Sequence, residues 1–206
     1  MRLVIGGPTR DTVPAAFAVD LAELYAYTVR WDAGAVWLRF VQATYVHVGR
    51  EGVLEAALER QATHLLWLDT DMAFPPDTAV RLARHDRPIV AANCVMKDPR
   101  LLCTAQRSGK RIATTPASTG LEAVDSVGMA VMLMRTDVVR QLPRPWFRHG
   151  ENTETGADVG EDITFCRALR AAGHAILIDH DLSQEIGHIG QHTYRPACEA
   201  PIAVQR

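Results

Sequence analysis

The sequence predicts an α/β fold in which one largely parallel sheet is flanked by helices. Short apolar runs alternate along the chain with longer stretches whose apolar residues recur at helical spacing. Alternating strands and helices of this kind form parallel sheets with helices on their faces. The chain has 206 residues, of which 48% are hydrophobic, so it can bury one large core. We therefore expect a single domain over residues 1–192, followed by an irregular C-terminal tail over residues 193–206.

The first half of the chain carries the strand–helix alternation most clearly. A first buried strand is expected at residues 2–5, and a helix at residues 13–31 with Phe17, Leu21 and Leu24 on one face. The elements expected next are a strand at 35–40, a short extended piece at 44–48, a helix at 51–61, a strand at 65–68, a helix at 77–85 capped by Asp77, and a strand at 88–92.

The second half is expected to contain shorter strands of mixed direction. The strand candidates are residues 101–105, 112–115 and 127–134, and a proline-rich loop follows at 142–147. A helix is predicted at residues 162–172, because Gly173 is the type of residue that usually ends a helix. A last strand is predicted at residues 175–178. The sheet should therefore have a smaller mixed-strand part beside its parallel part.

Composition excludes several classes of protein. The formal charge of −2 and a pI near 6.4 argue against a chain coated with nucleic acid or bound to an anionic membrane. No apolar stretch is long enough to span a bilayer and no leader is visible, so we expect a cytoplasmic protein without a membrane partner. The four cysteines lack close pairing, which disfavours a structural zinc site or a disulfide framework.

The most informative feature is Asp69 and Asp71 directly after the apolar run that ends at Leu68. Residues two apart on an extended chain point the same way, so both carboxylates can face one point beyond the strand. Ligands of open α/β sheets bind at that edge, and Mg²⁺ is usually held by one or two carboxylates plus phosphate oxygens. The alternative is that these aspartates only form a turn, because aspartate favours turns.

Further polar residues stand at similar junctions. Asp162, with Glu161 as the second choice, begins a predicted helix and could act as a general base, although acidic residues there also simply cap helices. His188 lies between glycines after the last strand and could be a third metal ligand, or a structural histidine. Arg10 and Arg50 stand where loops meet helices, which suits phosphate contacts but also solvated charges.

The order of these motifs resembles the nucleotide-sugar-dependent glycosyltransferases of the GT-A fold, in particular compact family-2-like members of phages and bacteria. The resemblance covers the chain roughly from Val4 to Gly190. Its motifs, in order, are Pro8-Thr9-Arg10, Gly49-Arg50-Glu51-Gly52, Asp69-Thr70-Asp71 with its flanking Leu68 and Met72, the run from Gly128 to Arg135, Pro145-Trp146-Phe147, Gly160-Glu161-Asp162, and His188.

This resemblance implies a GT-A, Rossmann-like nucleotide-diphospho-sugar transferase fold and a role for each matched residue. Asp71 and His188, with Asp69, would hold Mn²⁺ or Mg²⁺, and Asp162 would be the catalytic base. The residues that would contact the nucleotide sugar are Pro8, Thr9, Arg10, Arg50, Asp69, Thr70 and Gly128.

The predicted function is metal-dependent transfer of a sugar from a nucleoside-diphosphate sugar to an acceptor hydroxyl on a protein, a glycan or a hydroxylated base in DNA. A basic stretch from Lys97 to Arg111 is the reason to consider DNA. Trp146 and Phe147 are the candidates for stacking on the acceptor, although aromatic residues flanked by proline also serve as packing residues.

Three other functions remain open at this stage. A strand followed by Asp-x-Asp also begins the haloacid dehalogenase-type phosphatases, although their pattern has Thr or Val where Ala73 stands here. A sugar-phosphate nucleotidyltransferase is suggested faintly by the glycines before Pro8. The third is a relative that binds a nucleotide or a sugar without turning it over.

Overall fold

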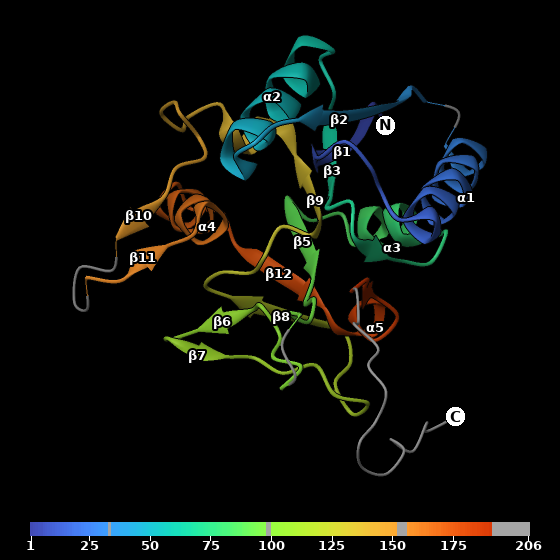
Figure 1. The fold of residues 1–206 in the computed structure, drawn as a ribbon. Helices are drawn as coiled ribbons and strands as arrows, with labels where there is room; N and C mark the ends of the chain where they lie inside the picture. The colour runs from blue at the N-terminus through green and yellow to red at the C-terminus, as the bar shows by residue number, and fades with distance from the viewer. Residues whose placement is uncertain (33, 98–99, 152–155, 191–206) are drawn as a thin grey trace, which may run out of the picture.

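The computed structural model describes residues 1–32, 34–97, 100–151 and 156–190. A seven-stranded sheet runs through the middle of the molecule, with helices on both of its faces (Figure 1). The predicted α/β class with a mostly parallel sheet is therefore confirmed. In sheet order the strands are β2 (Val36–Gln42), β1 (Leu3–Thr9), β3 (His64–Leu68), β9 (Val131–Arg135), β5 (Ile89–Ala92), β12 (Ile176–Asp179) and β8 (Leu121–Val124).

The sheet is parallel except for two strands. Strands β2, β1, β3, β5 and β12 run in one direction, whereas β9, between β3 and β5, and the edge strand β8 run in the other. The carboxyl ends of β1, β3 and β5 therefore lie along one edge of the sheet, next to the start of β9. In open α/β sheets this edge is the place for a ligand.

Alternation along the buried strands divides the core into two layers. Leu65 and Trp67 of β3 pack in one hydrophobic cluster, while Leu66 and Leu68 pack in the other. Side chains alternate between the faces of a strand, so a strand buried on both faces is apolar throughout, as β3 is. The result is a three-layer arrangement with a separate core on each face of the sheet.

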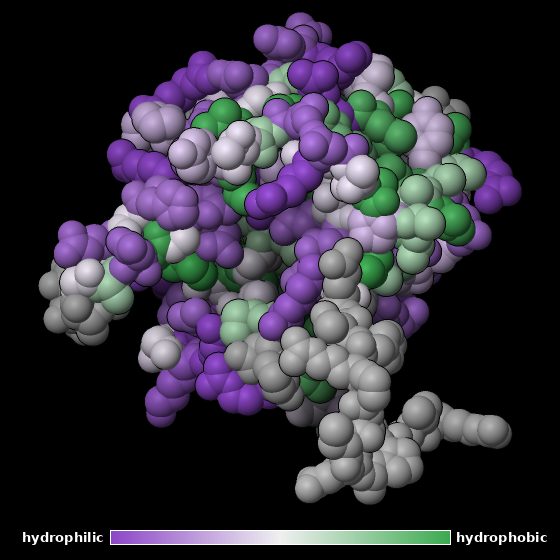
Figure 2. Space-filling view, viewed as in Figure 1, coloured by the Kyte–Doolittle hydropathy of each residue, from purple (hydrophilic) through white to green (hydrophobic). Residues whose placement is uncertain are grey.

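Two helices cover one face and three cover the other. Helices α2 (Val46–Glu59) and α4 (Glu161–Ala171) pack on the face that carries Trp67. Helices α1 (Ala15–Trp31), α3 (Thr78–Arg84) and α5 (His180–Ser183) pack on the opposite face (Figure 1). A short 3₁₀ helix, η1, spans Thr136–Val139. In Figure 2, hydrophobic residues gather over α1. Val19 and Val29 of this helix are exposed.

Three small two-stranded sheets lie outside the main one. They pair β4 (Met72–Ala73) with β13 (Gly187–His188), β6 (Gln106–Arg107) with β7 (Lys110–Arg111), and β10 (Gly150–Glu151) with β11 (Asp158–Val159), all antiparallel. The pairing of β13 with β4 brings the end of the described chain back beside Asp71.

Several sequence-based boundaries were wrong. Residues 44–48 were expected to be extended, but α2 begins at Val46. Its first turn packs closely on β1, since a methyl group at Gly49 would lie 2.8 Å from the Pro8 Cβ, and this contact is not visible in the local sequence. Residues 101–105 and 112–115 contain no strand; Cys103 forms only an isolated bridge with Val95. The hairpin β6–β7 and the edge strand β8 were not predicted, because two- to four-residue strands carry almost no periodicity.

Other expectations at element ends were met or refined. Gly173 follows α4 with a φ of +88°, a conformation that glycine adopts without strain, so the predicted helix end is confirmed. Asp77 does occupy the position before α3, but its side chain makes no capping hydrogen bond. The predicted tail at residues 193–206 lies outside the described residues. Within the described part of the chain, each helix is too short or too polar to cross a membrane.

Candidate active site

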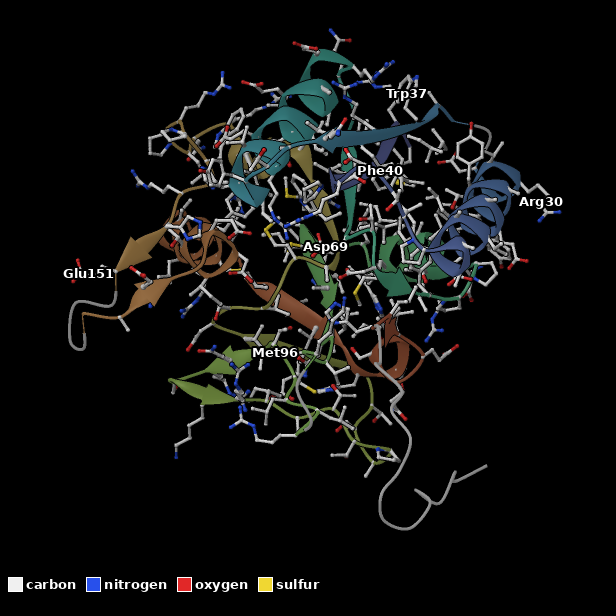
Figure 3. The ribbon with its side chains drawn as sticks, in the orientation of Figure 1. Arg30, Trp37, Phe40, Asp69, Met96 and Glu151 are labelled. Carbon is white, nitrogen blue, oxygen red and sulfur yellow. The ribbon has the colours of Figure 1, made fainter. Side chains whose placement is uncertain are left out.

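The carboxyl edge of the sheet brings the predicted site residues together. Asp69 is the first residue after β3, and its backbone N–H donates to the Ala130 carbonyl, 2.9 Å away, just before β9. Figure 3 shows Asp69 near the middle of the molecule, between α2 and the end of β5. The position of Asp69 is therefore fixed by its own strand, β3, and by the backbone just before the neighbouring strand β9.

A cavity of about 320 Å³ opens beside the aspartates. It lies between the loops that follow β1, β2 and β3. The residues that line it are Pro8, Thr9, Arg10, Thr12, Pro14, Ala43, Thr44, Val46, Asp69, Thr70 and Asp71. The structure thus collects five of the seven residues expected at the nucleotide sugar around one space, and adds Thr44 and Ala43, which the sequence did not single out.

Arg50, Asp69 and Glu161 form the inner wall of the site. The Arg50 Nη2 lies 3.3 Å from the Asp69 Oδ1, and its Nε donates to the Glu161 Oε1 at 3.2 Å. Arg50 is only 3% exposed, and its guanidinium lies 5.8 Å from the centre of the Trp67 ring. Its Nη1 is buried and has no hydrogen-bond partner among the described groups. Arg50 therefore ties α2, β3 and α4 together and retains one unused donor.

Asp71, Lys97 and His188 form the outer rim of the site. The Lys97 Nζ lies 2.6 Å from the Asp71 Oδ2, and the His188 Nε2 lies 3.3 Å from the same oxygen. His188 is oriented by its other ring nitrogen, Nδ1, which lies 2.9 Å from the Val95 carbonyl. Because a carbonyl only accepts, Nδ1 carries the hydrogen. The side chains of Asp71 and Lys97 are 40% and 44% exposed, so this rim faces solvent.

The rim sets the ionisation of Asp71. Partial burial by itself would raise the pKa of Asp71, but the hydrogen bond from Lys97 and the charge of His188 outweigh burial and lower the pKa below its usual range. Asp71 is therefore a carboxylate at neutral pH, and its Oδ2 is paired with the Lys97 ammonium.

Asp162 has the opposite electrostatic environment. Burial raises the pKa of Asp162, and the negative charges of Glu161 and Asp69 add to that effect. The Ile163 backbone N–H, which donates to the Asp162 Oδ1 at 2.7 Å, and the charge of Arg50 oppose the rise without cancelling it. A carboxylate with a raised pKa is a stronger base than an ordinary aspartate.

The side chains around Asp71 determine whether a divalent cation fits this site. In the described part of the chain, no group of three or more His, Cys, Asp or Glu side chains converges on one point. Asp71 and His188 do supply a carboxylate oxygen and an imidazole nitrogen 3.3 Å apart, with His188 oriented through Nδ1 as in metal sites. Two protein ligands fit a cation whose remaining ligands are phosphate oxygens and water. Asp69, by contrast, is engaged by Arg50.

The expected acceptor aromatics occupy different places. Phe147 is 1% exposed, and its ring packs between Trp67 and Phe165, so no acceptor reaches it in this conformation. Trp146 is partly exposed, and the Arg144 guanidinium lies 4.4 Å from the centre of its ring. The Trp146 Nε1 is buried and has no hydrogen-bond partner among the described groups. Gly128 is buried just before β9, and a methyl group there would lie 3.2 Å from Thr104.

Lys97 is the main functional candidate that sequence reasoning missed. The sequence placed it only at the start of a basic stretch. A signal was present, because Lys97 follows the carboxyl end of the next apolar run, residues 88–92, and the ends of parallel strands meet at one edge. Of the cysteines, Cys94, Cys103 and Cys166 are free and buried, and burial raises the pKa of Cys166 to about 12, which makes it an inert thiol.

Comparison with solved structures decides the fold. The chain superposes on A197 from STIV with a TM-score of 0.58 and 16% sequence identity, over 97% of this chain and 100% of that one. It superposes on GalNAc-T7, crystallised with UDP, GalNAc and Mn²⁺, with a TM-score of 0.56 and 11% identity, over 93% of this chain. The fold is that of the GT-A glycosyltransferases. No protein-family model and no curated protein matches the sequence.

The GT-A assignment confirms the resemblance drawn from the motif order and rests on architecture alone, because both identities are low. This chain spans 44% of the length of the GalNAc-T7 chain but all of the A197 chain.

Proposed function

We propose that this protein is a glycosyltransferase that moves a sugar from a nucleoside-diphosphate sugar to an acceptor hydroxyl with the help of Mn²⁺ or Mg²⁺. The observation that carries the proposal is the pair Asp71 and His188, 3.3 Å apart, beside a cavity that Asp69 and Asp71 line on the carboxyl edge of a GT-A sheet. GalNAc-T7, which shares the fold, was crystallised with UDP and Mn²⁺, and this supports a nucleotide donor and a divalent metal.

The cavity beside the aspartates is the donor site. Pro8 and Thr9 end β1 and provide one side of the cavity, and Thr44 provides a hydroxyl on the other. Arg10 can balance the charge of a diphosphate from the loop, since a guanidinium binds phosphate oxygens in pairs. Arg50 can offer its unpaired Nη1 to the donor at the inner wall. Thr70 and Gly128 are the remaining donor contacts that we assign, the latter through its backbone.

Asp71 and His188 would hold the metal, with Asp69 nearby to orient the donor ribose. A bound divalent cation supplies Lewis-acid stabilisation of the charge that develops on the departing diphosphate. The rim supports this role because the lowered pKa of Asp71 keeps its carboxylate ionised, and because the Val95 carbonyl orients the His188 ring toward Asp71.

The transfer breaks the bond between the sugar C1 and the diphosphate oxygen and forms a bond between C1 and the acceptor oxygen. Asp162 accepts the proton that the acceptor hydroxyl loses, and Glu161 is the second choice for that role. Two features favour Asp162: its raised pKa makes it the better base, while Glu161 already accepts a hydrogen bond from Arg50.

The acceptor is a molecule with a free hydroxyl, and we assign Trp146, which is partly exposed, to stack on it. DNA remains one acceptor to test. Of the basic stretch considered for DNA, Arg107 is paired with Glu122, and Arg111 donates to the Cys103 carbonyl. Binding to duplex DNA that weakens steeply with salt, and that weakens further in Arg107→Gln, is the result expected of a DNA acceptor.

The proposal is tested with Asp71→Asn and Asp162→Asn. Nucleoside diphosphates and their sugar conjugates are first screened by thermal shift with and without Mn²⁺, and the donor identified in this way is used for turnover. We expect Asp71→Asn to lose Mn²⁺-dependent binding of the nucleotide. We expect Asp162→Asn to bind the nucleotide normally but to transfer at least about a hundredfold more slowly, since general bases contribute that much.

A matched control is Glu23→Gln, which neutralises an exposed carboxylate on α1 outside the cavity and should behave as wild type. Full activity in either site variant would remove the role assigned to that residue. Release of inorganic phosphate from simple phosphomonoesters, without sugar transfer, would instead favour the phosphatase. Nucleotide binding without any turnover would favour the binding protein.

A further inference from the structure

The Lys97 ammonium is paired with the Asp71 oxygen that faces His188, where a metal on the outer rim would bind. Its Nζ is 2.6 Å from the Asp71 Oδ2, and it is this oxygen, not Oδ1, that faces the His188 Nε2 at 3.3 Å. A divalent cation bound between Asp71 and His188 therefore competes with the Lys97 ammonium for the same oxygen. Two positive charges at one oxygen repel each other, so binding of the cation favours release of the ammonium.

The surroundings of Lys97 allow such a movement. Val95, two residues earlier, is anchored by the hydrogen bond from His188 and by its bridge to Cys103, and Met96 donates a backbone hydrogen bond to the Leu102 carbonyl. The Lys97 side chain itself is 44% exposed, and Asp71 is the partner seen for its ammonium. The backbone before Lys97 is thus held in place, while its side chain is exposed and its ammonium is paired with Asp71.

The choice of residue is informative. The chain has 22 lysine and arginine residues, and only those at positions 97 and 110 are lysines. Arginine forms planar, paired hydrogen bonds, whereas lysine carries a compact charge on a flexible stem with three rotatable donors. A lysine can therefore leave one oxygen anion for another without breaking a planar pair.

We propose that Lys97 is a second cationic ligand for the donor diphosphate, held on Asp71 until metal and diphosphate arrive and then transferred to a phosphate oxygen. This inference rests on the proposed function. Without a ligand, Lys97 neutralises Asp71. With metal on Asp71, the freed ammonium lies beside the cavity that receives the diphosphate, where negative charge increases as the bond to the sugar breaks. Lysine groups placed at such a charge stabilise the transition state of transfer.

The test uses Lys97→Met, which keeps the length of the side chain and removes its charge, and Lys110→Met as the matched control on the exposed strand β7. Mn²⁺ binding without nucleotide is measured by electron paramagnetic resonance. Binding of the nucleoside diphosphate identified by thermal shift is then measured by calorimetry in saturating Mn²⁺. Both measurements are independent of turnover.

We expect effects of opposite sign in Lys97→Met. Mn²⁺ alone should bind about two- to fivefold more tightly, because an exposed ion pair of ordinary strength no longer competes. The diphosphate should bind about tenfold more weakly, because a charge-assisted hydrogen bond is lost. Lys110→Met should match wild type in both measurements.

Amine acetylation followed by mass spectrometry gives a second readout in the unaltered protein. The rate at Lys97, relative to Lys110 in the same molecule, should rise with Mn²⁺ alone and fall when the diphosphate is added. If wild type binds both ligands but the relative acetylation rate at Lys97 changes with neither of them, the inference is overturned.

The remaining outcomes separate the two proposals. Weaker binding of both Mn²⁺ and diphosphate in Lys97→Met would mean that Lys97 only supports the rim, and unchanged binding of both would mean that it has no role; either result overturns the inference and leaves the proposed function standing. A wild-type protein that binds neither Mn²⁺ nor any nucleoside diphosphate would overturn both.

Discussion

The inner wall and the outer rim of the site use the same chemistry, carboxylates beside cations, in opposite environments. On the inner wall, Asp69 and Glu161 share Arg50, whose side chain is 4% exposed and belongs to a helix packed on the sheet. On the outer rim, Asp71 shares Lys97 and His188, and the carboxylate and the ammonium are both open to solvent. The two aspartates are separated by one residue.

This difference teaches which groups hold the site in shape and which are free to exchange partners. Buried ion pairs cost desolvation, but breaking one leaves an unpaired charge in the interior, so the inner wall resists rearrangement. Exposed pairs contribute little to stability and exchange readily with solvent or ligands. We therefore expect substitutions on the inner wall to change folding, and those on the rim to change binding.

The largest effect on stability is expected from Arg50→Met. This substitution removes the cation between Asp69 and Glu161 and should lower the free energy of unfolding by about 3 kcal/mol at pH 7, the size typical of breaking a buried pair. Urea unfolding measures the change. Arg39→Met, on the exposed part of the edge strand β2, is the control and should stay within about 0.5 kcal/mol of wild type. Equal, small changes in both variants would contradict a structural inner wall.

An intermediate effect of opposite sign is expected from Asp162→Asn. Because the pKa of Asp162 is raised on folding, its ionisation favours the unfolded chain, and this cost grows as pH rises above the unfolded pKa and is complete above the folded pKa. Asn keeps an oxygen for the Ile163 N–H and removes the charge. The melting temperature should therefore rise by a few degrees at pH 7, at about 2–4 °C per kcal/mol.

The same comparison at pH 3 supplies the internal control for Asp162→Asn. Below the unfolded pKa, Asp162 is protonated in both states, so the variant and wild type should melt together. A melting temperature that falls at pH 7 would mean that the Asp162 carboxylate is stabilised by its surroundings, and would contradict the raised pKa.

The smallest effect on stability is expected from Asp71→Asn. The lowered pKa of Asp71 gives a contribution that is present above the unfolded pKa and is lost as pH falls through the folded pKa. Because Asp71 and Lys97 are both largely exposed, solvent screening should keep this contribution within about 0.5 kcal/mol. Urea unfolding at pH 7 should thus leave Asp71→Asn close to wild type, although its Mn²⁺ binding is lost. A loss of stability as large as that of Arg50→Met would erase the distinction between wall and rim.

Much of the fold could be predicted from local patterns. The apolar run ending at Leu68 is buried on both faces, and the helix ending at Gly173 has the turn that glycine permits. The errors fell on elements that tertiary contacts define. The first turn of α2 packs Gly49 closely on Pro8, a contact between two elements, and the strands β6, β7 and β8 are too short to have a period of their own.

By itself, the sequence determined the α/β alternation and the position of Asp69 and Asp71 at the end of a buried strand, because strand periodicity and polar strand ends are local properties. Only the tertiary structure decided the partners of those carboxylates. Arg50 reaches Asp69 and Glu161 across 19 and 111 residues. Lys97 reaches Asp71 from the segment after β5, and His188 reaches it through the return of β13 onto β4. Coulombic interactions depend on distance in space, and no local pattern records which distant charges folding will bring within 3 Å or so of each other.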